Sequence, residues 1–307
     1  MKMSNYWDKR QKQWIDNQDK ADEQLTKKLE KEYRKTASEL EKEIARYFQM
    51  YGEDGVIEFR TLMKELPASD KKLLFEDFEA FAEEHPEYEH LLPVRESIYK
   101  LNRLEGLHYS TQLELLELGA IEQKEIDNHL RKTYGKHFEY VAKELGLGNQ
   151  FLALDSKVIT DTIYKKWVDD GNFSTRIWGN KEKLLNHITT VYRDGLVRGD
   201  DYKQMSVLLS KRLGVALNDA KRLVWTESSF VLNQAHAQPY VEAGVTEYRI
   251  NAIIDSRTSD ICRELHKQAE KGETFRFDEM MVGINYPPFH SWCRSVVTGV
   301  GLDKLLD

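Results

Sequence analysis

Residues 245–254 read Val-Thr-Glu-Tyr-Arg-Ile-Asn-Ala-Ile-Ile, and this stretch decides the fold class. It alternates partly between apolar and polar residues and is rich in β-branched side chains, which is typical of a β-strand. Further short β segments are expected at Thr274–Phe277 and Ser295–Val300, with a turn over 255–260 and a short helix over Ile261–Lys271. The sequence therefore predicts a small α+β module behind a helical body.

The part of the chain before Gly244 follows a helical period instead. Residues 4–51 form one long amphipathic pattern, with charged residues on the remaining faces. Apolar or small residues recur every three or four positions, at Leu25, Leu29, Tyr33, Ala37, Leu40, Ile44, Tyr47 and Tyr51. Such a narrow stripe packs on another helix, either within this chain as a helical hairpin or on another subunit.

Shorter helical patterns follow, each bounded by a capping residue, a glycine or a proline. Ser69 or Asp70 can cap a helix that ends before His85-Pro86, and Pro93 suits the first turn of a helix through Leu104. The other expected helices are Leu113–Leu118, Ile121–Tyr134, Phe138–Leu145, Lys157–Asp169 capped by Ser156, Lys181–Gly195, Tyr202–Leu213 and Leu217–Ala237. We predict an α+β fold that is mainly helical. It comprises a helical region over 1–150, a second helical part over 151–244 and the α+β module over 245–307.

Composition narrows the function classes. The chain has 307 residues, of which 32% are charged, and a net charge of −7, which argues against a general nucleic-acid coat. Residues 51–90 hold 12 acidic against 4 basic residues, a pattern typical of a solvated helical face. No run approaches the roughly 18 apolar residues of a membrane helix, and residues 1–20 lack the apolar core of a secretory signal. We expect no membrane contact, and a location in the cytoplasm or in a particle assembled there.

Two cysteines and two histidines near the end of the chain form a candidate metal site. Cys262, His266, His290 and Cys293 make a Cys-x3-His…His-x2-Cys set, and these ligand types and spacings suit zinc. Asp255 is an alternative fourth ligand. A tetrahedral zinc would staple a module that buries little core of its own. The alternative is structural, with Cys262 as a small buried apolar residue and His290 as a hydrogen-bonded turn residue; a catalytic or redox-active cysteine is a third interpretation.

Other polar and aromatic positions also admit two interpretations. Asp255-Ser256-Arg257-Thr258-Ser259 is expected either to order its own turn or to contact an anion. Cys262 and His290 could pair as nucleophile and base, although no oxyanion-type glycine-rich loop adjoins them. Glu227 is expected to pair with an arginine or to cap a neighbouring loop, rather than to act as an acid or base. The tryptophans Trp167, Trp178 and Trp225 are expected as core anchors rather than as platforms for stacked bases.

Four groups of residues, in this order, resemble the phage Mu F-like minor head proteins. The first is Trp167, then Asn172-Phe173-Ser174 and Arg176-Ile177-Trp178; the second is Trp225-Thr226-Glu227, Asn233, Tyr240 and Gly244-Val245; the third is Asp255-Ser256-Arg257-Thr258-Ser259 with Cys262-Arg263-Glu264-Leu265; the fourth is Pro287-Pro288-Phe289-His290 with Cys293-Arg294-Ser295. The resemblance covers about residues 155–300, and each group alone is weak.

The sequence also departs from the family pattern. Trp225 stands where the family usually has Arg, and Ser291-Trp292 replaces a pair that contains Pro. His266-Lys267 occupies positions where an acidic residue and Gly are common. Cysteine-rich members have cysteines at the positions of Ser259 and Ser295. These departures bear more on the metal site than on the family.

The resemblance implies a structural protein of a tailed bacteriophage rather than an enzyme. Family members of this kind are low-copy minor capsid proteins that act in head morphogenesis, associate with the portal during procapsid assembly and meet other head or scaffold proteins. Some stay inside the virion and contact or follow the phage DNA. The alternatives are a nuclease- or transferase-like enzyme in the C-terminal module, or a zinc-dependent nucleic-acid-binding module, which the acidic charge disfavours.

Overall fold

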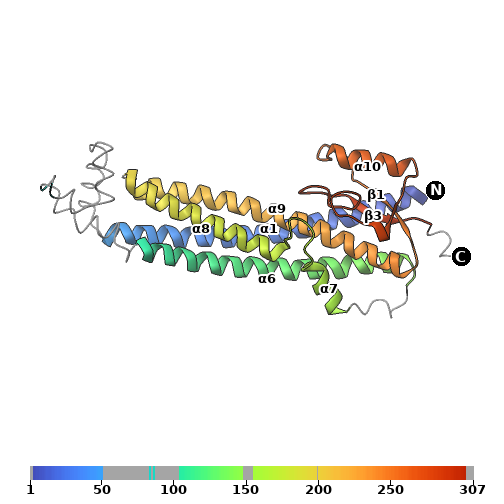
Figure 1. Ribbon diagram of the computed structural model, residues 1–307, viewed down its shortest axis with the longest axis horizontal. Coiled ribbons are helices and arrows are strands. Elements are labelled where there is room, and N and C mark those ends of the chain that lie inside the picture. The colour runs from blue at the N-terminus through green and yellow to red at the C-terminus, as the bar shows by residue number, and fades with distance from the viewer. Residues whose placement is uncertain are drawn as a thin grey trace. The chain divides into compact units, whose positions relative to one another are not determined.

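The fold is mainly helical, with a small sheet near the C-terminus, as predicted (Figure 1). The computed structural model describes residues 3–50, 104–147, 155–198 and 200–301, together with Glu83 and Pro86. Its α-helices are α1 (Met3–Met50), α6 (Leu104–Glu144), α7 (Ser156–Ile163), α8 (Phe173–Arg198), α9 (Tyr202–Glu242) and α10 (Asp260–Glu270). The strands are β1 (Glu247–Asn251), β2 (Phe275–Arg276) and β3 (Val296–Gly299), and a 3-10 turn covers Phe277–Glu279.

The long amphipathic pattern of residues 4–51 is confirmed as helix α1. Its predicted stripe is buried at five positions, namely Leu25, Leu29, Tyr33, Leu40 and Ile44. The helices expected between Ser69 and Leu104, and the acidic stretch over 51–90, lie outside the described residues apart from Glu83, Pro86 and Leu104.

Several of the predicted helix breaks are wrong, because glycine does not end the helix there. Helix α6 runs without interruption through Gly119 and Gly135, α8 continues past Gly195 to Arg198, and α9 runs through Gly214. A Cβ atom at Gly119 would lie 2.7 Å from Cζ3 of Trp178, so the glycine permits close packing inside a continuous helix. At Gly214 a Cβ would meet nothing within 4 Å, and the helix tolerates the cost of about 1 kcal/mol that glycine carries.

The short helices around residue 165 also differ from the prediction. Helix α7 ends at Ile163 rather than Asp169, and its cap is Asp155, whose carboxylate accepts a hydrogen bond of 2.8 Å from the backbone N–H of Lys157. Helix α8 begins at Phe173 because Asn172 caps it. The backbone N–H of Thr175 donates to Oδ1 of Asn172 at 3.1 Å, and the N–H of Asn172 donates to Oγ1 of Thr175 at 3.0 Å.

The three strands form an antiparallel sheet in the order β2-β1-β3. In this register Tyr248 lies opposite Gly299, and Asn251 lies opposite Val296. All three strands are shorter than the predicted β segments. A Cβ at Gly299 would lie 2.7 Å from Cδ1 of Tyr240, so glycine lets strand β3 approach helix α9 closely.

The chain divides into two compact units, and each long helix contributes residues to both. The first unit comprises Met1–Leu29, Ile121–Ile177 and Asn218–Asp307, and the second comprises Glu30–Ala120 and Trp178–Leu217. The predicted division at residues 150 and 244 remains a prediction. In the second unit, Nζ of Lys181 donates to the hydroxyl of Tyr33 at 2.6 Å, inside the helical packing.

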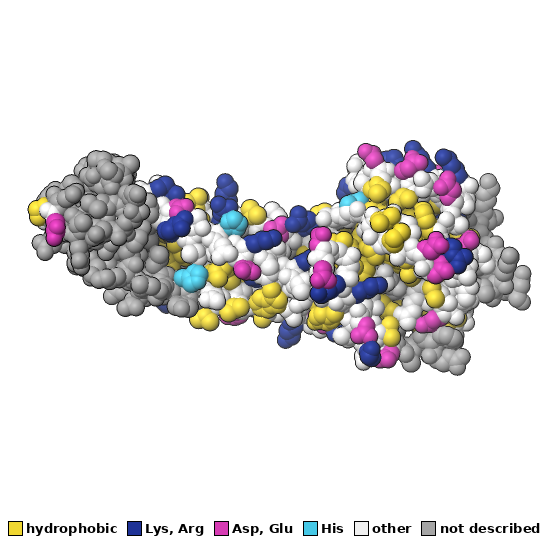
Figure 2. Space-filling view, viewed as in Figure 1, with side chains coloured by type: hydrophobic (Ala, Val, Ile, Leu, Met, Phe, Trp, Pro, Cys, Tyr) yellow, Lys and Arg dark blue, Asp and Glu magenta, His cyan; other side chains and the backbone are white. Residues whose placement is uncertain are grey.

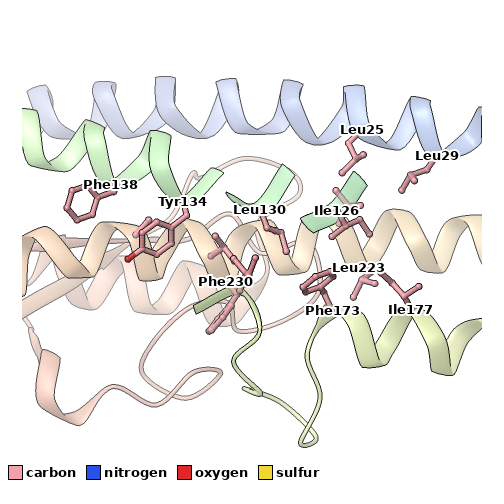
Figure 3. Packing of buried hydrophobic residues seen from close by; sticks show 14 of the residues in the cluster. Leu25, Leu29, Ile126, Leu130, Tyr134, Phe138, Phe173, Ile177, Leu223 and Phe230 are labelled. Atoms are coloured by element: carbon pink, nitrogen blue, oxygen red, sulfur yellow. The ribbon is translucent and has the colours of Figure 1, made fainter. Parts of the chain in front are cut away.

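The core of the first unit joins segments that are far apart in the sequence. One cluster contains residues of α1, α6, α8 and α9, and its members point toward one another in Figure 3; those labelled are Leu25, Leu29, Ile126, Leu130, Tyr134, Phe138, Phe173, Ile177, Leu223 and Phe230. A second cluster packs Tyr248 and Val297 of the sheet against Trp14 and Tyr240. The sheet therefore rests on the N-terminal helix as well as on α9.

Candidate metal centre

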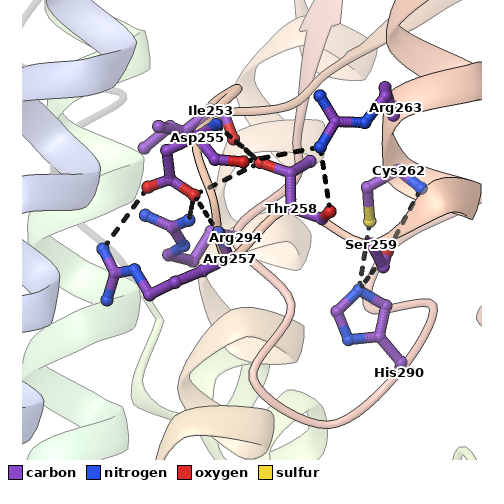
Figure 4. A network of polar contacts seen from close by, with 9 residues as sticks. All are labelled: Ile253, Asp255, Arg257, Thr258, Ser259, Cys262, Arg263, His290 and Arg294. Atoms are coloured by element: carbon purple, nitrogen blue, oxygen red, sulfur yellow. Dashed lines mark hydrogen bonds and ion pairs between the residues drawn. The ribbon is translucent and has the colours of Figure 1, made fainter.

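Cys262, His290 and Cys293 converge at one point of the C-terminal module (Figure 4 shows the first two). The Sγ atom of Cys262 lies 3.2 Å from Nε2 of His290 and 3.8 Å from Sγ of Cys293, and all three atoms lie within 4.8 Å of one another. Cys262 occupies the first turn of α10, and Ser259 caps this helix by accepting from the N–H of Cys262 at 3.3 Å. His290 and Cys293 lie on the loop that leads into β3.

The hydrogen bonds of His290 determine which ring nitrogen is available. Its Nδ1 lies 2.7 Å from the carbonyl oxygen of Ser291, and a carbonyl only accepts, so Nδ1 carries a proton. In the neutral ring, Nε2 then presents a lone pair toward Cys262 and toward Oγ of Ser259, which is 2.8 Å away. An Nδ1–H held by a backbone carbonyl is the arrangement that orients a metal-binding histidine.

The two thiols are free and buried, with 3% of Cys262 and 4% of Cys293 exposed. The hydrogen bond from Cys293, followed by that from Ser259, lowers the pKa of Cys262 to about 5. The same contact with Cys262, together with burial, raises the pKa of Cys293 well above its ordinary value. The pair therefore favours a thiolate on Cys262 that accepts the S–H of Cys293.

Two sulfurs and an imidazole nitrogen form a donor set that suits zinc, because thiolate and imidazole are its usual ligands. A tetrahedral ion would take three of its ligands from this group. The group connects the start of α10 to the loop before β3, which are 28 to 31 positions apart in the chain. Among the described residues this is the group of histidine, cysteine or acidic side chains whose ligand atoms could hold a metal ion.

The other two predicted ligands do not join this group. His266 turns toward strand β1, where its Nδ1 faces the backbone N–H of Ala252 at 3.4 Å and its Nε2 lies 3.9 Å from Glu270. It lines a hollow with Ile15, Ile253 and other residues, and Figure 2 shows apolar side chains gathered beside α10 on the visible face.

Asp255 orders the turn before α10 (Figure 4). Its Oδ1 accepts from Nη2 of Arg294 at 2.6 Å and from the N–H of Arg257 at 2.8 Å. The bond from Arg294 holds the pKa of Asp255 well below its usual range, despite the opposing effect of burial. The hydroxyl of Thr258 accepts from the N–H of Asp255 at 2.8 Å and lies 2.7 Å from the carbonyl of Ile253. These contacts fit the interpretation in which the turn orders itself.

Glu227 joins two of the sequence groups that were singled out separately. Nε1 of Trp167 donates to its Oε2 at 3.0 Å, and Arg176 forms an ion pair with its Oε1. Trp167 stacks on Phe230 with ring centroids 4.7 Å apart, and the Arg176 guanidinium lies 4.9 Å from the Trp167 ring centroid. Burial raises the pKa of Glu227, while Arg176 and Trp167 oppose the rise.

Asn233 attaches helix α9 to strand β3. Its Nδ2 donates to the carbonyls of Ser229 at 2.8 Å and Ser295 at 3.0 Å, and its Oδ1 accepts from the N–H of Val297 at 3.0 Å. Its own carbonyl accepts from the hydroxyl of Tyr286 at 2.5 Å. The sequence marked Asn233 as a motif residue but did not predict this role.

A buried polar cluster, here called the helical polar core, was missed by sequence reasoning. It lies between α1, α6 and α9 and consists of Gln18, Asp22, His129, Thr133, His137, Ser228 and His236. Oδ1 of Asp22 lies 2.6 Å from Nε2 of His129 and accepts from Oγ of Ser228 at 2.8 Å. The available signal was spacing, since Gln18 and Asp22 continue the apolar stripe of Leu25 and Leu29 in steps of four and three.

Two departures from the family pattern contact each other in the fold. The rings of Trp225 and Trp292 have centroids 5.3 Å apart and are tilted by 41°. Trp292 has φ 65° and is 44% exposed, so this pair lies at the surface of the loop that carries His290 and Cys293. Trp167 and Trp225 are both partly buried; Trp167 packs against the core cluster of the first unit.

These features describe a helical protein whose small α+β module is held to α9 and α1 by buried polar contacts and closed by a Cys/His group. Residues 186–298 match the model of the family described as phage Mu protein F like protein. The match confirms the resemblance over this segment, and the family that it resembles is one of structural head morphogenesis proteins. The group from Trp167 to Trp178 precedes the matched segment.

No curated protein and no solved structure gives a significant match to the chain. Among the helices of the described residues, none has the length and apolar character needed to cross a membrane.

Proposed function

We propose that this protein is a minor capsid protein that acts at or near the portal during procapsid assembly, and that it stays in the capsid interior. The family match over residues 186–298 carries this proposal, because the family is one of head morphogenesis. The motif residues support it by what they contact. Glu227, Asn233 and Asp255 each bind other groups of this chain, as expected for residues that build a docking scaffold.

Co-expression with the portal protein of the same phage tests the proposal. We expect a complex that survives gel filtration at micromolar concentration, with an unrelated protein of similar size as a control that elutes separately. Independent elution of this chain and the portal would contradict the portal role. Contact with packaged DNA is a finer possibility within this function, and retention of radiolabelled phage DNA at low salt with loss at high salt would support it.

We also propose that Cys262, His290 and Cys293 bind one zinc ion with a structural role. The orientation of His290 by the Ser291 carbonyl and the burial of both sulfurs support a closed site. When bound, the ion would supply a tie between α10 and the loop before β3. Neither His266 nor Asp255 is included, because each has other partners in the turn and strand beside it.

Metal analysis of protein purified without a metal-affinity column tests this assignment. About one equivalent of zinc is expected in the wild type, lost in Cys293→Ser and in His290→Ala. His266→Ala is the matched control, because it removes an imidazole of the sequence-predicted set that does not reach the sulfurs. Zinc loss in His266→Ala with retention in His290→Ala would overturn the assignment, as would a wild type without metal.

A second function is favoured by one observation, the 3.2 Å approach of His290 to Cys262, which is the geometry of a nucleophile and its base. In a hydrolase or transferase of this kind, an electrophilic substrate analogue would form a covalent adduct with Cys262. Turnover of an ester, amide or nucleic-acid substrate that disappears in Cys262→Ser would support the enzyme and contradict a purely structural site.

A further inference from the structure

The two sulfurs of the candidate metal centre lie close to each other. Sγ of Cys262 and Sγ of Cys293 are 3.8 Å apart, and both thiols are free. We propose that, when no metal is bound, a low-molecular-weight disulfide such as oxidised glutathione converts this pair into an intrachain disulfide. The bond would close the same junction between α10 and the β3 loop that zinc closes. This inference rests on the proposed zinc site only for the prediction that zinc protects the thiols.

The geometry requires a short approach of two side chains rather than a change of fold. A disulfide has an S–S length of about 2.05 Å, so the sulfurs must approach by somewhat under 2 Å. Cys262 is fixed in the capped first turn of α10. Cys293 follows the exposed Trp292 in an irregular loop, which offers fewer constraints than a helix. We therefore expect Cys293 in the loop to move more than Cys262 in the helix.

Thiol–disulfide exchange then proceeds in two steps whose atoms and protons balance. The thiolate of Cys262 attacks one sulfur of oxidised glutathione, forms a mixed disulfide and releases a glutathione thiolate, which takes up the proton that the Cys262 thiol has given to solvent. Cys293 then attacks Sγ of Cys262 and releases a second glutathione as its thiol. Two protein thiols and one glutathione disulfide thus become one protein disulfide and two glutathione thiols.

The consequence for a head protein follows from its two environments. Thiols and thiolate-bound zinc are stable in a reducing cytoplasm, whereas released particles meet oxidising conditions. If the chain is carried in the virion as proposed, the same pair would hold the module before release through zinc and afterwards through a covalent bond. This step depends on the proposed location, but the formation of the bond in the purified chain does not.

Oxidation of the full chain in glutathione redox buffers tests the inference. The chain has two cysteines, so an intrachain disulfide can only join Cys262 and Cys293, and its position is not informative. The informative quantity is the equilibrium constant. We expect the metal-free folded chain to form the bond at least 100-fold more favourably than the same chain in 6 M urea, because the fold holds the sulfurs together.

Alkylation of the remaining thiols and intact mass measurement give the result. In a parallel sample, one equivalent of zinc is expected to slow oxidation at least tenfold. Equal constants in buffer and urea, separate glutathione adducts on each cysteine, or disulfide-linked dimers would overturn the proposal. If the wild type purifies without zinc and added zinc does not slow oxidation, but the favoured disulfide still forms, only the zinc assignment is refuted. His266→Ala should oxidise as the wild type does, because its imidazole does not reach the sulfurs.

Discussion

Two buried polar clusters of the first unit differ in how their atoms are satisfied. In the helical polar core, Oδ1 of Asp22 lies 2.8 Å from Gln18, 2.6 Å from His129 and 2.8 Å from Ser228, so this acceptor oxygen is surrounded by groups that can donate. In the metal centre, two sulfurs and one imidazole lone pair face one another. The groups around Asp22 are complementary to one another within the chain, whereas the second set is one that could bind a metal ion.

This difference separates structural motif residues from a candidate ligand site. Glu227 has an arginine and an indole N–H as partners, and Asn233 satisfies backbone groups of both α9 and β3. Cys262 and His290 belong to the same family pattern but are part of a donor set that could bind a metal ion. Motif membership alone therefore does not distinguish the two roles, whereas the balance of donors and acceptors does.

The largest loss of stability is expected when one partner of the Glu227–Arg176 ion pair is removed. Glu227→Ala removes the buried acceptor of the Trp167 indole N–H and the ion-pair partner of Arg176, and we expect a loss of about 3–5 kcal/mol in the free energy of unfolding. Urea denaturation followed by circular dichroism measures it. The control is Glu125→Ala, which removes the partner of Lys28 from a more exposed pair, and a cost of at most about 1 kcal/mol is expected. Equal losses in both variants would contradict the comparison.

The next effect concerns the attachment of the sheet to α9. Asn233→Ala removes the partners of the Val297 N–H and the Ser295 carbonyl, and we expect a loss of about 2–4 kcal/mol, since each orphaned buried group costs about 1–3 kcal/mol. Hydrogen exchange should also show lost protection at Val297 relative to wild type. Asn218→Ala, at an exposed position of the same helix, should change stability by less than about 0.5 kcal/mol. Unchanged hydrogen exchange at Val297 would contradict the role of Asn233 in attaching strand β3 to helix α9.

The sequence predicted the elements of the C-terminal module well because local patterns determine them. Strand β1 follows from the β-branched alternation, and helix α10 lies close to the predicted range of 261–271. The course of α6 and α9 was not predictable in this way. Gly119 looks like a helix break, and only the packing of Trp178 against it shows why a glycine stands in mid-helix.

The candidate site was predicted in part for a similar reason. Cys262, His290 and Cys293 have ligand chemistry that is visible from residue type and spacing. His266 fits the same spacing rule, but its side chain leaves α10 toward Ala252, and only the fold fixes that direction. The helical polar core joins residues more than 100 positions apart, such as Asp22 and His129, so no local pattern could reveal it.

A smaller loss of stability is expected from a substitution in the turn at Asp255. Thr258→Val removes a hydroxyl that serves both the Asp255 N–H and the Ile253 carbonyl, and a loss of about 1–2 kcal/mol is expected because water reaches part of this turn. Thr258→Ser keeps the hydroxyl and should retain most of the stability. Both variants are measured by urea denaturation. If the serine variant is as unstable as the valine variant, packing of the methyl group matters more than the hydrogen bonds.

The smallest effect concerns Asp19 of α1, beside the helical polar core. Burial raises the pKa of Asp19 to about 6; Asp22 and Asp16 add to the rise, whereas Arg294 and Arg257 oppose it. Because the folded state then binds the proton more tightly than the unfolded chain, this group's contribution to stability is full below about pH 4 and is lost as the pH rises through about 6.

Asp19→Asn keeps a neutral side chain at every pH. It should therefore match the wild type near pH 4 and exceed it at pH 7.5, by about 1 kcal/mol once solvent screening of this partly exposed group is allowed for. The midpoints of urea denaturation of both proteins, at four pH values between 4 and 7.5, measure this difference in stability. The titration of all other groups is common to both proteins and drops out of the difference. A difference that does not change with pH would mean that Arg294 and Arg257 hold Asp19 ionised, and that the edge of this cluster is as well satisfied as its centre.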